Sequence, residues 1–329
     1  MKVAVGISGG VDSAVAALML REAGHEVFGV TMTLGREGES EEVKGAYAAA
    51  EFLKIPLEVV DFSAEWKKEV LSYIKETYLS GKTPNPCVRC NEAVKMNLLP
   101  RFAFSKGADF FATGHYAKVK DGVIYRAQDK KKDQSYFLYR VEKDVLKRTL
   151  LPLGDFTKDA VREIALAHSF ELAKKGDSQD FCGGDVLEIV GEEERSGDII
   201  TLDGKVIGKH SGFWRYTVGK RKGLGIGGGT PYYVLSLDSE NNRVVVGPRE
   251  KSVTNGFMVG DVVPRDFSEE GEYTVKVRSA GEPKGPVKVS RLADGKLQVF
   301  CPEAIGAVAP GQSAVFYDGE RLVSGGVIL

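Results

Sequence analysis

A glycine-rich loop near the start of the chain carries side chains that could bind phosphate. Ser8-Gly9-Gly10-Val11-Asp12-Ser13 lies between a predicted strand over residues 3–8 and a predicted helix over residues 12–23. The two glycines let the backbone approach an anion, and the free N–H groups and positive dipole of the helix start can then bind it. Ser8 and Ser13 add hydroxyl donors, and Asp12 can help to hold Mg²⁺. The loop therefore predicts a phosphate site.

Other chemistries of glycine-rich loops fit these residues less well. A Walker A loop requires a lysine that the segment lacks, and a dinucleotide-binding loop requires a different glycine spacing. Gly6-Ile7-Ser8-Gly9-Gly10 matches the G-x-S-x-G nucleophile elbow of hydrolases. That elbow would lie on the first predicted strand, before any loop that could supply an oxyanion hole. A glycine turn without a ligand remains the plainest alternative.

A second segment, Thr83-Pro84-Asn85-Pro86-Cys87-Val88-Arg89-Cys90-Asn91, contains two cysteines. The prolines predict an extended loop, and Asn91 can cap the helix that follows. Cys90 would then lie just before a helix N-terminus, where a thiolate is stabilised. The remaining cysteines, Cys182 and Cys301, are too few and too distant for a disulfide framework or a second zinc-binding pair. Reactive thiols are favoured over structural zinc and over inert cysteines.

The first half of the chain alternates apolar strands with amphipathic helices. Strands are predicted at 3–8, 27–32, 57–62 and 109–113, and helices at 12–23, 41–53, 64–79 and 91–105. Because strands and helices alternate regularly, this half predicts an α/β fold with a doubly wound parallel sheet.

The second half of the chain is β-rich. Short alternating runs separated by Gly, Asp-Gly and Asn-Asn turns occur at 199–202, 232–237, 243–246, 273–277, 287–290, 297–300 and 314–317. They predict two small β-rich modules, the last of them a β-barrel. We therefore expect three domains, with boundaries at 1–183, 184–248 and 249–329.

Composition excludes several classes of protein. The 329 residues are 43% apolar and 28% charged, with a net charge of −1. No apolar run approaches the roughly 18 residues of a membrane-spanning helix, and no signal peptide is recognisable before Val3-Ala4-Val5. We expect a cytoplasmic protein with no membrane partner. A nucleic acid would bind to local basic patches, such as 130–132 and 220–222.

Several segments together resemble one known family. The loop at 8–13 matches the S-G-G-x-D-S motif of the PP-loop ATP pyrophosphatases, which cleave ATP into AMP and pyrophosphate. Further matches follow in order at 83–91, 112–116, 132–138, 151–154, 177–178 before Cys182, 217–225 and 310–315. Over nearly the whole chain, the sequence resembles the bacterial tRNA-specific 2-thiouridylases of the MnmA type. This resemblance implies a PP-loop fold, like that of the adenine nucleotide alpha hydrolases, with 1–183 as the ATP-binding catalytic domain.

The resemblance also implies roles for individual residues. Cys90 matches the family's nucleophile and Cys182 the cysteine that carries a persulfide, and Cys87 and Asp12 complete the predicted catalytic set. The residues that would bind ATP are Gly6, Ile7, Ser8, Gly9, Gly10, Val11, Asp12, Ser13, Met32 and Gly114. The residues that would contact tRNA are Asn85, Pro86, Cys87, His115, Lys132, Asp133, Gln134, Arg278, Ser279 and Gln312.

The implied reaction answers a chemical need, because the carbonyl oxygen of uridine is a poor leaving group. Its attack on the α-phosphate of ATP gives an adenylate, from which AMP can leave. The loop and Mg²⁺ would stabilise the charge that develops on pyrophosphate. Sulfur from sulfide or from a persulfide-carrying protein then replaces the oxygen at C2 of the wobble uridine.

Two other functions use parts of the same sequence. A PP-loop synthetase could adenylate a small metabolite for amide transfer, but it would need neither the cysteines nor the β-rich modules. A tRNA-binding module without catalysis would not need an intact loop at 8–13.

Cys87 stands where many members of the family have aspartate, and the segments 34–42 and 185–198 are shorter than in many members. The extra cysteine leaves two sulfur pathways open. In one, Cys90 and Cys182 transfer sulfur as a persulfide. In the other, Cys87, Cys90 and Cys182 hold a [4Fe–4S] cluster whose fourth iron binds sulfide, and the third cysteine favours this pathway. Cys301 lies outside the matched segments and is expected to be dispensable.

Overall fold

The computed structural model divides the chain into two compact units. It describes residues 1–35, 41–168, 189–226, 231–268, 270–306 and 308–329. The first unit comprises 1–70, 87–183 and 320–322, and the second comprises 71–86, 184–319 and 323–329. Cys182 lies outside the described residues, as does the predicted boundary after residue 183. The three expected domains therefore stay predictions.

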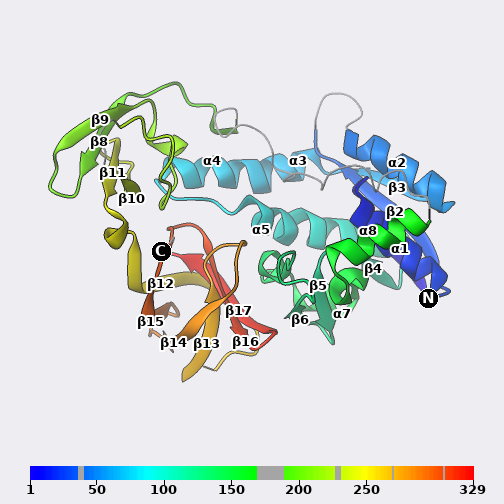
Figure 1. The fold of residues 1–329 in the computed structure, drawn as a ribbon. Helices are drawn as coiled ribbons and strands as arrows, with labels where there is room; N and C mark the ends of the chain where they lie inside the picture. Colours follow the sequence, from blue (N-terminus) through cyan, green and yellow to red (C-terminus); the bar gives the residue numbers. More distant parts are fainter. Residues whose placement is uncertain (36–40, 169–188, 227–230, 269, 307) are drawn as a thin grey trace. The chain divides into compact units, whose positions relative to one another are not determined.

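A parallel sheet forms the centre of the first unit (Figure 1). Its strands are β1 (Lys2–Gly6), β2 (Glu26–Thr33), β3 (Leu57–Asp61), β4 (Phe110–Ala112) and β7 (Thr149–Leu150), in the order β3-β2-β1-β4-β7. All neighbouring pairs are parallel. The side chains of Val3, Ala4 and Val5 are completely buried, as expected for a strand that is covered on both faces. The predicted doubly wound α/β fold is confirmed.

The order of the strands reverses at β1. β2 and β3 lie on one side of β1, and β4 and β7 lie on the other. Open α/β sheets bind their ligands at such a switch point, beside the carboxyl ends of the strands. The loop at 8–13 follows β1 and the segment 113–115 follows β4, so both leave the sheet at this point.

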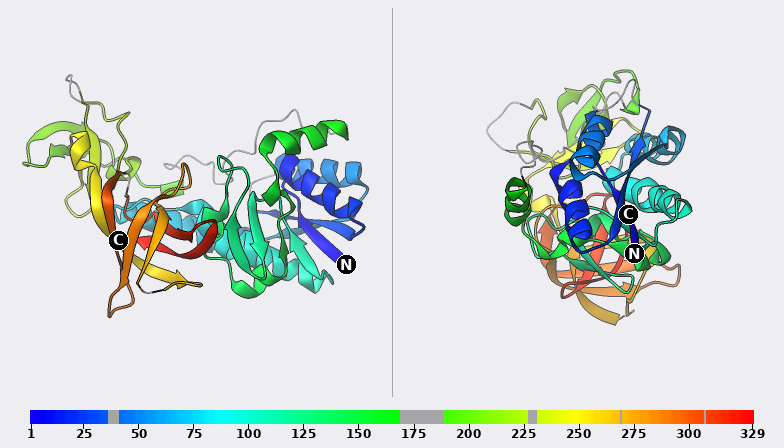
Figure 2. Two further views of the ribbon diagram at one scale, coloured as in Figure 1. Left: turned by 60° about the horizontal axis from the view of Figure 1, so that its bottom comes forward. Right: turned by 90° about the vertical axis from the view of Figure 1, so that its right-hand side faces the viewer.

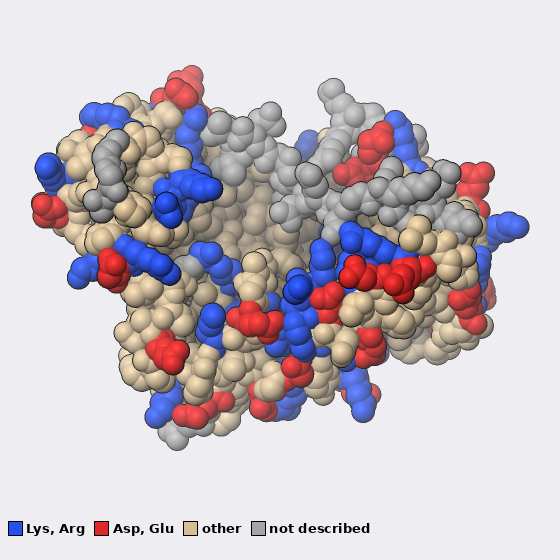
Figure 3. Space-filling view, viewed as in Figure 1, with Lys and Arg blue, Asp and Glu red and all other residues tan. Residues whose placement is uncertain are grey.

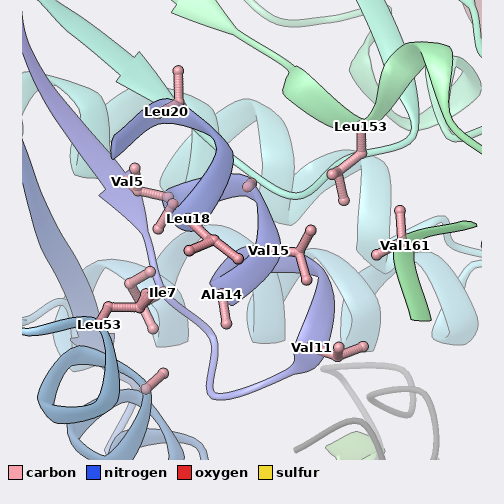
Figure 4. Packing of buried hydrophobic residues seen from close by; sticks show 14 of the residues in the cluster. Val5, Ile7, Val11, Ala14, Val15, Leu18, Leu20, Leu53, Leu153 and Val161 are labelled. Atoms are coloured by element: carbon pink, nitrogen blue, oxygen red, sulfur yellow. The ribbon is translucent and has the colours of Figure 1, made fainter. Parts of the chain in front are cut away.

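Helix α1 (Val11–Glu22) fixes the loop by packing onto the sheet. Figure 4 shows Ala14, Val15 and Leu18 in the apolar cluster that also contains Val5 of β1. Helix α8 (Lys158–Ala167) packs against α1, and the two helices are seen together in Figure 2. The remaining elements between β2 and α8 are α2 (Glu41–Leu53), α3 (Ser63–Trp66), η1 (Lys67–Leu71), α4 (Ser72–Leu79), α5 (Pro86–Cys90), η2 (Asn91–Leu98), α6 (Leu99–Ser105), β5 (Ala117–Lys120), β6 (Val123–Arg126), η3 (Ser135–Leu138), α7 (Lys143–Lys147) and η4 (Pro152–Asp155).

The cysteine segment differs from the sequence prediction. The helix begins at Pro86 instead of Asn91, because proline is well accommodated in the first turn of a helix. It continues as the π-helix η2 and then as α6. Cys90 has helical φ and ψ of −64° and −41°, and the Asn91 side chain donates a hydrogen bond to the Cys87 carbonyl (2.9 Å) instead of capping a helix start. The prediction that Cys90 precedes a helix N-terminus is therefore wrong.

One β module of the second unit is a four-stranded sheet. It consists of β8 (Gly197–Thr201), β9 (Val206–His210), β10 (Tyr233–Asp238) and β11 (Arg243–Gly247), in the order β10-β11-β8-β9. Its core contains Trp214, Val234 and Val244, and Tyr78 and Leu79 of α4 pack against it. These contacts explain why the segment 71–86 belongs to the second unit.

The other β module is a closed barrel. Its strands are β12 (Val253–Pro264), β13 (Glu270–Lys276), β14 (Lys284–Arg291), β15 (Leu297–Gly306), β16 (Ser313–Asp318) and β17 (Arg321–Ile328). The pairing of β12 with β17 closes the order β12-β15-β14-β13-β16-β17. At this seam a Cβ on Gly326 would lie 2.6 Å from the Gly260 carbonyl oxygen, so only glycine fits there. The predicted C-terminal barrel is confirmed. Within the described ranges, no helix has both the length and the apolar character needed to cross a bilayer.

Candidate functional site

The loop after β1 is held in shape by its own side chains and by close backbone packing. Gly9 has a φ of 75°, the left-handed conformation that glycine adopts without strain. A Cβ at Gly9 would lie 2.9 Å from the Cα of Gly45 in α2, so the two backbones touch. The backbone N–H of Ser8 donates to the Ser13 hydroxyl (3.1 Å), which donates in turn to the Gly10 carbonyl (3.0 Å). Ser13 therefore organises the loop from within.

The Asp12 carboxylate at the start of α1 is bound by two side chains from distant parts of the chain. The Lys158 Nζ lies 2.7 Å from Oδ1 and 2.8 Å from Oδ2, and the Tyr116 hydroxyl donates to Oδ1 (2.8 Å). The side chain of Lys158 is 6% exposed and that of Asp12 27% exposed. A buried ammonium group is tolerated only with such a partner. Lys158 is the first residue of α8, whose start is capped by the Thr157 hydroxyl.

Sequence reasoning missed Lys158 altogether and gave Tyr116 no individual role. Asp12 and Lys158 are 146 positions apart, and no local spacing relates them. The nearest available signal was the capping threonine directly before Lys158, which marks the start of a helix but not its orientation.

Gly114 closes the other side of the loop. A Cβ on Gly114 would lie 2.7 Å from the Asp12 carbonyl carbon and 2.7 Å from the Ser13 nitrogen. The segment after β4 is therefore pressed against the first turn of α1. The predicted ATP-binding residues 6–13 and Gly114 come together here, while Met32 lies near the carboxyl end of the adjacent strand β2. Their assignment to ATP stays a prediction.

The charge of Lys95 acts on both Cys90 and His115. Burial raises the pKa of the Cys90 thiol, and the nearby Lys95 ammonium partly opposes that rise. Burial, and then Lys95, lower the pKa of His115 to about 3, and the ring nitrogen Nδ1 is hydrogen-bonded to the Thr113 hydroxyl (2.7 Å). His115 is therefore neutral at physiological pH. Its predicted contact with tRNA would be a hydrogen bond and not an ion pair.

The helix that carries the cysteines is fixed by an ionic network. Arg89 pairs with Glu69 and with Glu92 (3.0 Å), and Glu92 also accepts a hydrogen bond from Arg140 Nε (2.7 Å). Cys87 is half-buried and Cys90 is buried. Because these cysteines are three positions apart on a helix, they lie on the same side of it.

The loop before the cysteine helix is anchored within the second unit. The Thr83 N–H donates to the Pro310 carbonyl (2.8 Å), and Gln312 Nε2 donates to the Pro84 carbonyl (2.6 Å). The Asn85 side chain donates to the Ser313 hydroxyl (3.4 Å). Gln312 was predicted to contact tRNA, and the structure gives its amide a second use in holding this loop.

The predicted tRNA contacts differ in how accessible they are. Asp133 is buried and accepts hydrogen bonds from the Ala127 N–H (3.1 Å) and the Ser135 hydroxyl (3.1 Å), which explains its burial without a ligand. Lys132, Arg278 and Ser279 are exposed. On the face in Figure 3, basic and acidic side chains are interspersed, so this face shows no large patch of positive charge alone or negative charge alone. The tRNA assignments stay predictions.

In the described part of the chain, no three side chains of His, Cys, Asp or Glu lie close enough together to hold a metal ion. The third cysteine of the predicted cluster, Cys182, is outside that part. Cys301 is buried in the apolar core of the barrel beside Val299, as expected for a cysteine with a packing role.

Three family models match successive parts of the chain. Residues 1–183 match the family model described as the tRNA methyl transferase HUP domain. Residues 185–248 match the tRNA methyl transferase PRC-barrel domain, and residues 257–328 match the aminomethyltransferase beta-barrel domain. A solved 4-thiouridine synthetase in complex with RNA and ATP is similar over 54% of this chain and 43% of its own, at 20% identity with a TM-score of 0.41.

Full-length relatives share far more sequence. The tRNA-specific 2-thiouridylase MnmA of Carboxydothermus hydrogenoformans is 39% identical, over 99% of this chain and 97% of that protein. The enzyme of the same name from Geotalea uraniireducens is 40% identical over 99% and 94%, and that from Clostridium acetobutylicum is 38% identical over 99% of both. The present chain belongs to the family of the tRNA-specific 2-thiouridylases.

Proposed function

We propose that this chain is a tRNA-uridine 2-sulfurtransferase that uses ATP to activate the wobble uridine and then exchanges its C2 oxygen for sulfur. The observation that carries this proposal is the loop at 8–13, which leaves the sheet at its switch point and shares a unit with Cys87 and Cys90. Family membership supports ATP as the co-substrate and tRNA as the substrate.

The loop residues would act on the phosphates of ATP. The backbone N–H groups at Gly9 and Gly10, at the start of α1, would bind phosphate oxygens, and Ser13 would keep the loop in the shape that presents them. Gly114 and Met32 would lie at the nucleotide. Asp12 supplies a carboxylate at this helix start, the kind of ligand that Mg²⁺ takes together with substrate phosphates, and Mg²⁺ would have to share or displace the Lys158 ammonium that both oxygens of this carboxylate now bind. Mg²⁺ neutralises phosphate charge when it is bound.

The sulfur step requires a thiolate, and the structure makes Cys90 resist ionisation. Burial raises the pKa of its thiol, so binding of substrate, sulfur transfer or metal ligation would have to favour the thiolate. Lys95 is the nearby positive charge that would favour the thiolate.

Two sulfur carriers fit the cysteines. Cys87 and Cys90, on one side of a helix, could supply two thiolates to a [4Fe–4S] cluster, with Cys182 as the third. Such a cluster supplies an iron that can bind sulfide. The persulfide pathway uses Cys182 and Cys90 and leaves the Cys87 thiol without a role in sulfur transfer, so we favour the cluster.

The remaining assignments complete the proposal. Lys132, Arg278 and Ser279 would contact tRNA from exposed positions, and Asn85, Pro86 and Cys87 would lie at the target base. His115 and Gln134 would donate hydrogen bonds, and Asp133 and Gln312 would shape the loops that carry such contacts. The same proposal includes three domains, at 1–183, 184–248 and 249–329, and a cytoplasmic location. It also includes sulfide or a persulfide-carrying protein as the sulfur donor.

The adenylation step is tested by tRNA-dependent release of pyrophosphate. We expect AMP and pyrophosphate to form in equal amounts only when tRNA is present, and the variant Asp12→Ala to form neither. Asp12→Asn, which keeps an oxygen beside the buried Lys158 ammonium, separates loss of catalysis from loss of the ion pair. Release driven by ammonia and a small carboxylate, without tRNA, would indicate an amide-forming synthetase. Absence of ATP cleavage under every condition would indicate a binding module.

The sulfur carrier is tested by anaerobic iron and sulfide analysis of Cys87→Ala, Cys90→Ala and Cys182→Ala, with Cys301→Ala as the control. The cluster predicts that iron and thiolation are lost in the first three variants and kept in the control. An iron-free parent protein that thiolates tRNA at full rate, together with an active Cys87→Ala variant, would establish the persulfide pathway instead.

A further inference from the structure

Asn91, the residue after Cys90, carries a buried hydrogen-bond acceptor that the described fold does not use. Its side chain is 4% exposed, and its Nδ2 donates to the Cys87 carbonyl oxygen (2.9 Å). Among the residues that the structure describes, none donates a hydrogen bond to its buried Oδ1. Because a carbonyl oxygen can only accept, the bond to Cys87 identifies Nδ2 as the nitrogen. The end of the carboxamide that lacks a partner there is therefore an acceptor.

This acceptor lies beside the two cysteines of the same helix. Asn91 follows Cys90 directly and is four positions from Cys87, so its side chain lies on the side of the helix that carries both thiols. A buried polar atom without a partner costs free energy, and native proteins seldom keep one unless water or a ligand supplies the missing bond. The position of Oδ1 therefore indicates a ligand with a hydrogen-bond donor near the cysteines.

We propose that Asn91 is a specificity-determining residue that accepts a hydrogen bond from the N3–H of the target uridine. This inference rests on the proposed function, since it assumes that uridine is activated beside Cys87 and Cys90. The edge of uracil next to C2 offers one donor, N3–H, between the acceptors O2 and O4. Cytidine has no hydrogen on N3, so its ring nitrogen would leave the Asn91 oxygen unpaired. Because Oδ1 is covered by protein, the side chains over it shift as the base enters.

The reaction itself strengthens this hydrogen bond. The C2 oxygen of uridine forms a bond to the α-phosphorus of ATP, the bond from that phosphorus to the bridging oxygen breaks, and the electron pair leaves with pyrophosphate. The N3 proton stays on the base in this step, so positive charge develops over O2, C2 and N3. An acceptor opposite N3–H stabilises that charge, and Asn91 therefore binds the transition state more tightly than it binds uridine.

The test compares two tRNAs that differ only in carrying uridine or cytidine at the wobble position. Pyrophosphate release by the full-length protein is followed in single-turnover reactions, which also measure slow substrates, and the ratio of the two kcat/KM values gives the preference for uridine. Asn91→Ala should lower this ratio about 10- to 100-fold, the effect of one buried hydrogen bond. A side chain that only stabilises the helix would slow both tRNAs alike and leave the ratio unchanged.

The matched control is Asn97→Ala. Asn97 lies in the same π-helix η2, and its side-chain oxygen already accepts a hydrogen bond from Arg101 Nε (2.6 Å). Its replacement should leave the ratio at the parent value.

A second measurement uses the parent protein alone and decides the inference even if Asn91→Ala does not fold. A tRNA with 3-methyluridine at the wobble position offers no N3 donor, and its kcat/KM should be at least about tenfold lower than that of uridine. A tRNA with 5-methyluridine keeps N3–H and should react within about threefold of uridine.

The outcomes separate this inference from the proposed function. An unchanged ratio in Asn91→Ala, or a parent protein that activates 3-methyluridine as efficiently as uridine, would overturn the role of Asn91 and leave the adenylation of uridine standing. A parent protein that releases no pyrophosphate with the uridine tRNA would contradict the proposed function itself.

Discussion

Replacing Gly114 with alanine adds one methyl group at the tightest contact around the proposed ATP loop. The new Cβ would lie 2.7 Å from two backbone atoms, the Asp12 carbonyl carbon and the Ser13 nitrogen. Ordinary contact begins near 3.4 Å, so the segment after β4 and the start of α1 must separate by about 0.7 Å. Backbone atoms on both sides cannot rotate away as a side chain could. The shift must therefore pass to the loop itself.

Two effects of known size follow from this displacement. Overpacking of this kind costs about 1–3 kcal/mol, and each kcal/mol lowers the melting temperature of a unit of this size by about 2–4 °C. Catalysis should suffer more than stability, because a misplacement approaching 1 Å reduces rates by up to about 100-fold. We expect tRNA-dependent pyrophosphate release by Gly114→Ala to fall at least about tenfold.

The assay measures pyrophosphate release at saturating ATP together with thermal unfolding. Gly306→Ala is the matched control, since the nearest atoms to its Cβ would lie at 3.6 and 3.9 Å, and it should change stability by less than about 0.5 kcal/mol. If Gly114→Ala released pyrophosphate at the parent rate and melted with the control, the packing of Gly114 against α1 would not position the loop.

Three further predictions concern other parts of the structure. The pKa of His115 is lowered from 6.5 to about 3, so the stability that its neutral ring contributes is complete above pH 6.5 and is lost as the pH falls toward 3, at up to about 1.4 kcal/mol per pH unit. The free energy of unfolding in urea should therefore depend more steeply on pH in the parent than in His115→Gln, and equal slopes would contradict this. Gln312→Glu should reduce thiolation while leaving AMP binding unchanged, because the new carboxylate would face the Pro84 carbonyl oxygen and could not donate the hydrogen bond that holds this loop. Unchanged thiolation would show that Gln312 does not anchor the loop before the cysteine helix. Affinity for tRNA should fall steeply with salt, and Arg278→Ala should reduce the slope of log K against log salt by about 0.7–0.9, the share of one phosphate contact, whereas the control Lys296→Ala should not.

Local sequence signals predicted most of the α/β unit. The helix at 41–53 and the strand at 57–61 have the predicted starts because apolar periodicity is strong there. β12 and β17 escaped prediction because Asn255-Gly256, Gly260 and Gly325-Gly326 interrupt their alternation, yet these glycines lie within continuous strands. In those strands the glycines permit bulges and the close approach that closes the barrel.

The candidate site was predictable only where its residues are adjacent in sequence. The loop at 8–13 could be found because all of its donors lie within one turn. The start of the cysteine helix was misjudged, because prolines favour extended loops and the first turn of helices equally well. The pairing of Asp12 with Lys158 depends on how α8 packs on α1, and that contact between distant segments leaves no local pattern.

The central claim is tested most directly by mass spectrometry of tRNA nucleosides after incubation of the protein with unmodified tRNA, ATP and sulfide. We predict that the wobble uridine becomes 2-thiouridine, with one AMP formed per sulfur inserted, and that no product forms when ATP is omitted. ATP cleavage without any thiolated nucleoside, or sulfur inserted at a position other than C2 of uridine, would contradict the proposed function.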